Sequence, residues 1–202
     1  MKIIKQSIGL IWITPKAERN IEYCGRISYK SENLITSTSA KDFIKKIIEL
    51  GHESVLEHAS ASIKIITNRG ISHEIVRHRL ASYTQESTRY CNYAKNKFNN
   101  ELTFIEQNYS DIKTYCRWTT LLQRIELDYL RMVNKNNIKP EIARGILPND
   151  LKTELAMTAN FREWRHFLKL RTSPKAHPQM QELANMIWNV LKAHAPTVFE
   201  TL

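Results

Sequence analysis

A long amphipathic segment that begins near residue 110 constrains the fold more than any other feature of this sequence. Its large apolar residues recur at spacings of 4, 3, 4 and 3: Trp118, Leu122, Ile125, Tyr129 and Met132. That period puts the five side chains on one face of an α-helix. Ser110 precedes the segment and is predicted to be its N-cap. We therefore expect the longest helix of the protein here, with this face in the core.

Shorter helices and a few strands are expected elsewhere along the chain. Helical patterns occur at residues 16–27, 39–50 (with Ser39 as cap), 140–146 and 161–170, and from residues 72 and 178 onward. Strands are predicted at residues 2–14, 59–66 and 102–105, and a turn at 68–70. Alternating patterns are typical of antiparallel sheets. The predicted fold class is α/β of the α+β type, a mostly antiparallel sheet flanked by long helices in a single domain over residues 1–202.

The net charge and the hydropathy of the chain limit the classes of protein to which it can belong. Thirty Lys and Arg residues against twenty Asp and Glu give a formal charge of +10, which attracts anions such as nucleotides, folates or nucleic acid. The longest apolar run, at residues 8–13, is far shorter than the ~20 residues of a membrane span. The first five residues lack the layout of a signal peptide. We therefore expect a cytoplasmic protein with no membrane partner.

The spacing of cysteine, glycine and histidine argues against several common sites. Cys24, Cys91 and Cys116 are odd in number and far apart, so neither disulfides nor a structural zinc site is predicted. The five glycines are too scattered for a nucleotide-binding glycine loop. His73 and His78 are five positions apart, so on a helix they diverge and cannot hold one ion. We predict no metal site.

The densest chemical cluster is the segment 77–90, Arg-His-Arg-Leu-Ala-Ser-Tyr-Thr-Gln-Glu-Ser-Thr-Arg-Tyr. Adjacent cations repel unless an anion lies between them, and a guanidinium can bind phosphate through two hydrogen bonds. A solvated basic face of a helix would explain the charges as well. The interleaved Ser82, Ser87 and Tyr90 favour a nucleotide pocket instead. Cys91, the next residue, is interpreted as a packed thiol rather than a nucleophile.

This segment resembles the signature of the flavin-dependent thymidylate synthases, Arg-His-Arg-x-x-Ser-x-Asn-Glu-x-Ser-x-Arg-Tyr. Seven fixed positions match: Arg77, His78, Arg79, Ser82, Ser87, Arg89 and Tyr90. Further pieces follow the order of the family, namely Gly51-His52-Glu53, Glu57-His58, Ala143-Arg144, Leu147-Pro148, Asn160, Phe167-Leu168 and Leu170-Arg171. The resemblance therefore covers nearly the whole chain.

The resemblance implies a reaction and a set of ligands. The reaction is the reductive methylation of deoxyuridine monophosphate (dUMP) to thymidylate (dTMP), with methylenetetrahydrofolate as carbon donor. The family uses FAD as hydride carrier, reduced by NADPH, so its protein groups position and polarise rather than attack. It also implies a mostly antiparallel sheet with long helices and a homotetramer whose active sites are shared between subunits.

The same resemblance implies the residues of the site. Cofactor binding is expected from Ser54, Arg77, His78, Arg79, Gln85, Asn160, Arg162 and His166. Substrate binding is expected from Glu74, Arg77, Gln85, Glu86, Ser87, Thr88, Arg89, Arg144 and Arg171. The catalytic residue is expected to be Arg171, which would stabilise negative charge on the N3 and O4 edge of the uracil.

Departures from the family pattern keep two alternatives open. Thr84-Gln85 stands where Asn-Glu is usual, with Glu86 one residue later, and His166 stands where Asn is common. A flavoprotein that lacks synthase activity would fit these departures. A basic nucleic-acid-binding module would fit the charge of +10. Because the basic residues are spread along the chain, we do not expect nucleic acid as a partner.

Overall fold

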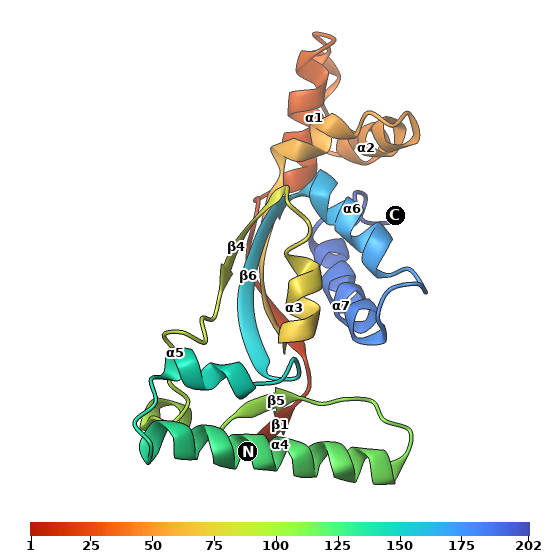
Figure 1. The fold of residues 1–202 in the computed structure, drawn as a ribbon. Coiled ribbons are helices and arrows are strands. Elements are labelled where there is room, and N and C mark those ends of the chain that lie inside the picture. The colour runs from red at the N-terminus through yellow and green to blue at the C-terminus, as the bar shows by residue number, and fades with distance from the viewer. The chain divides into compact units, whose positions relative to one another are not determined.

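The computed structural model of the protein describes residues 1–202 (Figure 1). The strands are β1 (Lys2–Ile4), β2 (Ser7–Ile13), β3 (Ser60–Asn68), β4 (Ala81–Gln85), β5 (Thr103–Ile105) and β6 (Lys152–Asn160). The α-helices are α1 (Ala17–Ile27), α2 (Ser39–Glu49), α3 (Arg69–Ile75), α4 (Ile112–Asn134), α5 (Pro140–Ala143), α6 (Phe161–Arg171) and α7 (Pro178–His194). Short 3₁₀ helices are η1 (Glu32–Leu34), η2 (Glu53–His58), η3 (Asn96–Phe98) and η4 (Arg144–Ile146). None of the helices combines the length and the hydropathy needed to span a bilayer.

The strands form two sheets. Four strands pair in the order β2-β3-β6-β4, and β1 pairs with β5. The predicted class, helices with a mostly antiparallel sheet, is confirmed. The pair of β1 and β5 is an exception, because it is parallel, with Lys2 opposite Thr103 and Ile4 opposite Ile105.

Contacts within the chain group it into two compact units. Unit 1 comprises Met1–Gln6, Ile66–Ile75 and Gln85–Leu155. Unit 2 comprises Ser7–Ile65, Val76–Thr84 and Ala156–Leu202. The single domain over residues 1–202 stays a prediction.

The core of unit 1 forms around α4, the predicted longest helix. Trp118, Leu122 and Tyr129 of α4 are buried in one cluster with Leu102 and Phe104, as the spacing of the apolar residues predicts. Burial of such side chains contributes about 1.5–3 kcal/mol each to folding. The helix therefore owes its position to this apolar face.

The predicted cap of α4 is off by one residue. The N-cap is Asp111, not Ser110, and its carboxylate accepts hydrogen bonds from the backbone N–H groups of Lys113 and Thr114 at 3.2 and 2.9 Å. A carboxylate can accept both bonds at once and its charge complements the helix dipole, so the helix begins after Asp111.

The core of unit 2 forms where α6 and α7 pack against each other. Phe161, Trp164 and Phe167 of α6 and Leu183 and Ile187 of α7 are fully buried. The Trp164 indole N–H donates to the carbonyl of Ala61 in β3 at 3.1 Å. This bond and the buried rings fix α6, the helix that supplies half of the residues lining the cavity described below.

Several predicted boundaries are wrong. The strand expected at residues 2–14 is interrupted at Lys5-Gln6, and the turn expected at 68–70 is the start of α3, where the Asn68 side chain accepts from the Ile71 N–H at 2.8 Å. Ser39 is the first residue of α2 rather than its cap, and its hydroxyl donates to Glu22 at 2.9 Å.

Two strands were not predicted. Residues 77–90 do not form a basic helix face, because α3 ends at Ile75 and residues 81–85 form β4. The argument that His73 and His78 share a helix is therefore wrong as well. Strand β6 was missed although its alternate residues Thr153, Leu155 and Met157 are buried.

Candidate functional site

The site residues inferred from the resemblance divide between the two units. Unit 2 holds Ser54, Arg77, His78, Arg79, Asn160, Arg162, His166 and Arg171. Unit 1 holds Glu74, Gln85, Glu86, Ser87, Thr88, Arg89 and Arg144. Unit 2 thus contains all the cofactor positions except Gln85, and unit 1 contains all the substrate positions except Arg77 and Arg171.

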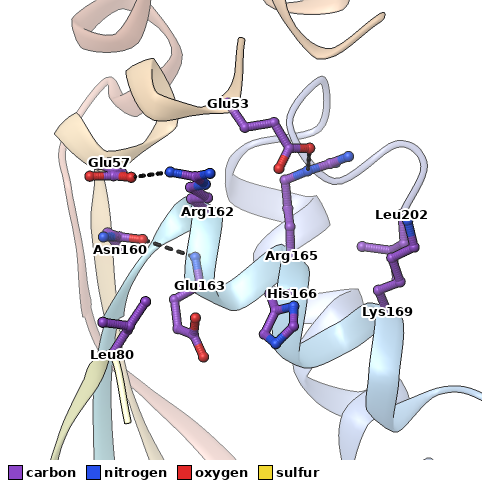
Figure 2. Close-up of a pocket in the computed structure, with 10 residues that line it drawn as sticks. All are labelled: Glu53, Glu57, Leu80, Asn160, Arg162, Glu163, Arg165, His166, Lys169 and Leu202. Atoms are coloured by element: carbon purple, nitrogen blue, oxygen red, sulfur yellow. Dashed lines mark hydrogen bonds and ion pairs between the residues drawn. The ribbon is translucent and has the colours of Figure 1, made fainter. Parts of the chain in front are cut away.

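A cavity of about 620 Å³ in unit 2 brings together three of the cofactor positions (Figure 2). It lies where β6 runs into α6, and Asn160 caps the helix by accepting from the Glu163 N–H at 2.9 Å. Its lining consists of Glu53, Glu57, Leu80, Asn160, Arg162, Glu163, Arg165, His166, Lys169 and Leu202. The volume falls within the ~300–1,000 Å³ of small-molecule sites.

Charged side chains of both signs line this cavity. Figure 2 shows Arg162 directed toward Glu57, at 2.7 Å, and Arg165 toward Glu53, at 3.5 Å. Arg162 and Glu57 are each about half exposed, so this ion pair can open when an anion binds. Lys169 is exposed and forms no ion pair.

Arg165 has a different role from its neighbours. It is buried, and its guanidinium donates to the carbonyls of Val198 and Thr201 at 2.5 and 2.6 Å. These bonds attach the segment after α7 to α6. We therefore assign Arg165 to the architecture of the cavity wall rather than to ligand binding.

His78 is the centre of a buried network against α6. Its Nδ1 lies 3.2 Å from a carboxylate oxygen of Glu163, and its Nε2 accepts a hydrogen bond from Arg171 Nε at 3.1 Å. The ring packs edge-on against Phe167 and His166, with centroid distances of 4.9 and 5.7 Å.

Burial of the ring lowers the pKa of His78 below 6.5, and the nearby Arg171 and His166 lower it further. The hydrogen bond and the charge of Glu163 oppose this shift without reversing it. His78 is therefore neutral at pH 7. A neutral ring can donate at one nitrogen and accept at the other, as this network requires.

Ligand atoms of His78, Glu163 and His166 lie within 4.8 Å of one another, a grouping that could hold a metal ion. The sequence spacing did not suggest this grouping. Both ring nitrogens of His78 already have partners, and one of them is the cation Arg171. A metal ion would have to displace one of these partners, and the absence of a metal site stays a prediction.

Four cofactor positions of unit 2, the buried His78 and three exposed residues, do not line the cavity. Arg77 and Arg79 flank His78 on either side, are exposed, and form no hydrogen bond or ion pair within the chain. Ser54 is exposed in η2 and lines a second cavity of about 850 Å³, formed by α1, α2 and η2. The side chains of Arg77 and Arg79 are thus available to an external anion.

In unit 1, two guanidinium groups gather at the segment that contains Ser87 and Thr88. Arg144 donates to the Thr88 hydroxyl at 3.2 Å, and Arg89 pairs with Glu141 at 3.2 Å. Both arginines are exposed. Two cations and two hydroxyl groups on neighbouring residues are suited to bind a phosphate.

Gln85 and Glu86 are both held by neighbours within unit 1. Glu86 accepts from the Tyr93 hydroxyl at 2.7 Å and pairs with Lys152 at 2.9 Å. Gln85 donates to the hydroxyls of Ser72 and Thr153 at 2.9 and 3.1 Å. The carboxylate of Glu86 is therefore balanced by an ammonium group. Glu74 lies in α3 and is partly buried.

The sequence pointed to Asn160, Arg162 and His166 but missed other residues of the network. Arg165 comes three residues after Arg162, and Lys169 comes four residues after Arg165. These helical spacings could have marked one face of α6. Glu163 gave no such signal, because its partner His78 is 85 positions away in sequence.

Cys91 is partly buried next to this region of unit 1. Burial raises the pKa of its thiol, and the negative charge of Glu86 raises it further. A thiol that resists ionisation is a poor nucleophile. The arrangement supports the interpretation of Cys91 as a packed thiol.

Comparisons with known proteins agree with the resemblance. The sequence model of a family described as thymidylate synthase complementing protein matches residues 9–197. A flavin-dependent thymidylate synthase of Geobacter sulfurreducens is 34% identical over 199 residues, which cover 95% of this chain and 84% of that protein. Proteins of the same name from Pyrococcus furiosus and Mycobacterium avium are 35% and 36% identical over 178 and 194 residues. These matches cover 87% and 89% of this chain and 70% and 77% of the two proteins.

Proposed function

We propose a function from the premise that this chain belongs to the flavin-dependent thymidylate synthase family, as the family model and the relatives show. The chain converts dUMP to dTMP with FAD as cofactor. The carbon donor would be methylenetetrahydrofolate, as the family implies. The alternative of a basic nucleic-acid-binding module has no comparable support. A flavoprotein without synthase activity remains distinguishable by assay.

The observation that carries the proposal is the pair of exposed arginines around a buried histidine. Arg77 and Arg79 have no partner in the chain, and two like charges two residues apart are stabilised when an anion binds between or beside them. A dinucleotide supplies that anion in its diphosphate. The cavity beside α6 offers Arg162 and Lys169 as further cations. These residues therefore fit FAD.

The residues proposed to hold FAD are Ser54, Arg77, His78, Arg79, Gln85, Asn160, Arg162 and His166. When bound, FAD supplies the hydride carrier of the reaction. Asn160 fixes the start of α6 through its cap, which keeps Arg162 and His166 at the cavity wall. Gln85 is supported less by its contacts, because its amide donates to two hydroxyl groups of unit 1.

The residues proposed to bind dUMP have different tasks. Arg89 and Arg144, with Ser87 and Thr88, would neutralise and orient the phosphate. Arg171 would hold a fixed positive charge against the N3 and O4 edge of the uracil, where negative charge develops. Arg77, Glu74, Gln85 and Glu86 complete the proposed substrate set.

Glu86 would act through its neighbours rather than as a base. Its carboxylate is already balanced by Lys152 and accepts from the Tyr93 hydroxyl. It therefore would hold the segment that precedes Ser87 in place. A proton-transfer role is not needed for this assignment.

The assembly and the remaining partners are part of the proposal. A homotetramer with shared active sites, NADPH as the reductant, a cytoplasmic location and the absence of nucleic acid as a partner all stay predictions.

The test is an assay of the purified protein with dUMP, methylenetetrahydrofolate, NADPH and added FAD. We expect dTMP to form only when dUMP, methylenetetrahydrofolate and NADPH are all present and the protein holds FAD. A yellow protein that makes no dTMP would instead favour the inactive flavoprotein. A colourless protein that takes up no FAD and binds DNA would refute the assignment.

A further inference from the structure

We propose that Glu163 is a positioning residue, which acts through His78 to fix the direction of the Arg171 guanidinium. The inference rests on the proposed function, in which Arg171 acts on the uracil ring. Glu163 itself matches no position of the family signature described above. Its role follows from three contacts on one helix.

The geometry places the imidazole of His78 between two charged groups of α6. Glu163 and Arg171 are eight residues apart, which corresponds to about 12 Å along a helix axis. The ring of His78 bridges them, with Nδ1 at 3.2 Å from Glu163 and Nε2 at 3.1 Å from Arg171. It rests on Phe167, halfway between the two in sequence.

The donors and acceptors of this bridge determine one tautomer. Arg171 Nε–H can only donate, so Nε2 of His78 must be the nitrogen without a proton. The proton of the neutral ring is then on Nδ1, where it points at the carboxylate of Glu163. A carboxylate can only accept, so it selects this tautomer. The carboxylate of Glu163 thus keeps Nε2 of His78 unprotonated, so that Nε2 can accept the hydrogen bond from Arg171.

Burial makes the bridge rigid. The side chains of His78 and Glu163 are only 4% and 7% exposed, so a lost partner could not be replaced freely by water. The backbone of His78 is held as well, because the Tyr83 hydroxyl donates to its carbonyl at 2.7 Å. Arg171 is only partly buried. Its Nε is therefore anchored on the protein side by the bond to His78.

A purely structural role for Glu163 gives different expectations. Glu163 lies in the first turn of α6, where a negative charge interacts favourably with the helix dipole and stabilises the helix. If that were its only role, its loss would lower the melting temperature and leave kcat unchanged. If Glu163 also orients Arg171 through His78, its loss lowers kcat even in a variant whose melting temperature is close to that of the wild type.

The experiment compares the variants Glu163→Gln and Glu163→Ala with the wild type. Gln keeps the size of the side chain, but its amide can also donate to Nδ1 and so permit the other tautomer. We expect kcat to fall about 10- to 100-fold, the range seen when hydrogen-bond partners that orient metal-ligating side chains are removed, with little change in KM for dUMP or in flavin content. Glu49→Gln, at an exposed position at the end of α2, is the matched control and should behave like the wild type.

A double variant tests whether the effect passes through Arg171. In an Arg171→Ala background, Glu163→Gln should lower kcat by less than about twofold further, because coupled residues are not additive. Effects that multiply would overturn the proposal. So would an unchanged kcat in Glu163→Gln, or a loss of kcat explained entirely by lost flavin.

Nitrogen NMR of the histidine rings gives a readout that does not depend on activity. With His78→Gln used to assign the signals, wild-type His78 should carry its proton on Nδ1, and Glu163→Gln should shift the ring toward the other tautomer. A wild-type proton on Nε2 would overturn the bridge. A wild type that shows the expected tautomer but forms no dTMP would refute the proposed function, and with it the catalytic role of the bridge.

Discussion

Replacing Arg171 and Arg144 separately by Ala should produce two different kinetic defects. The side chain of Arg144 is exposed and donates to a neutral hydroxyl at 3.2 Å, whereas Arg171 is partly buried and anchored to His78 at 3.1 Å. An exposed cation on a phosphate binds ground state and transition state alike. An anchored cation on the uracil edge matters most as that edge becomes anionic.

The magnitudes follow from these environments. A hydrogen bond to a charged group contributes about 1.5–3 kcal/mol, and the exposure of Arg144 favours the lower end. We therefore expect Arg144→Ala to raise KM for dUMP about 10-fold, since 1.4 kcal/mol corresponds to a factor of ten. Loss of one preorganised donor costs about 2.7–4 kcal/mol, so Arg171→Ala should lower kcat about 10²- to 10³-fold.

The assay is steady-state dTMP formation with dUMP varied and the other components saturating. Folding and flavin content are checked for each variant. Arg171→Lys should restore only part of kcat, because a point charge lacks the planar fork and the Nε–H that bonds to His78. A near-normal kcat in Arg171→Ala would mean that Arg171 merely favours the C-terminal end of α6, an effect of about 0.3–1 kcal/mol on folding. The reasoning would then be refuted.

Three further predictions concern the cofactor, the thiol and pH. The double variant Arg77→Ala/Arg79→Ala should fold normally but carry little flavin, because both side chains are exposed and without partners; an unchanged ratio of flavin to protein absorbance would contradict this. Cys91→Ala should keep its kcat, because burial raises the pKa of the thiol; loss of turnover in the folded variant would indicate a thiol mechanism. The pKa of His78 lies below 6.5, so acidification through this range should protonate Nε2, break the bond to Arg171 and lower kcat. The free energy of unfolding should fall over the same range, because the unfolded chain then binds a proton that the buried ring resists. Denaturant titrations at several pH values, with His78→Gln for comparison, measure this slope.

The spacing of apolar residues in the sequence predicted those elements whose buried side chains recur at a regular interval. Helix α4 was predicted because its apolar residues recur at helical spacing and are buried on one face. Strand β6 was missed because its residues include Glu154, Leu155, Ala156 and Met157, which favour helices in isolation. Its place between β3 and β4 makes it a strand, and that pairing is a long-range property.

The candidate site shows the same division. The signature at residues 77–90 identified His78 and the flanking arginines, because neighbouring residues carry the pattern. The pairing of His78 with Glu163 depends on the contact between that segment and α6, which no local pattern encodes. A resemblance can thus name residues of a site, while the order of donors and acceptors among them comes from the fold.

The parallel pair of β1 and β5 sets a condition on how unit 1 forms during synthesis. Lys2, Ile3 and Ile4 pair with residues 103–105, so the first strand has no partner until that part of the chain has left the ribosome. At about 5–20 residues per second, the delay is on the order of 5–20 s. During that interval an apolar strand stays unpaired and open to other chains. Slower synthesis lengthens this interval, so slowing translation should prolong the exposure of the first strand rather than shorten it.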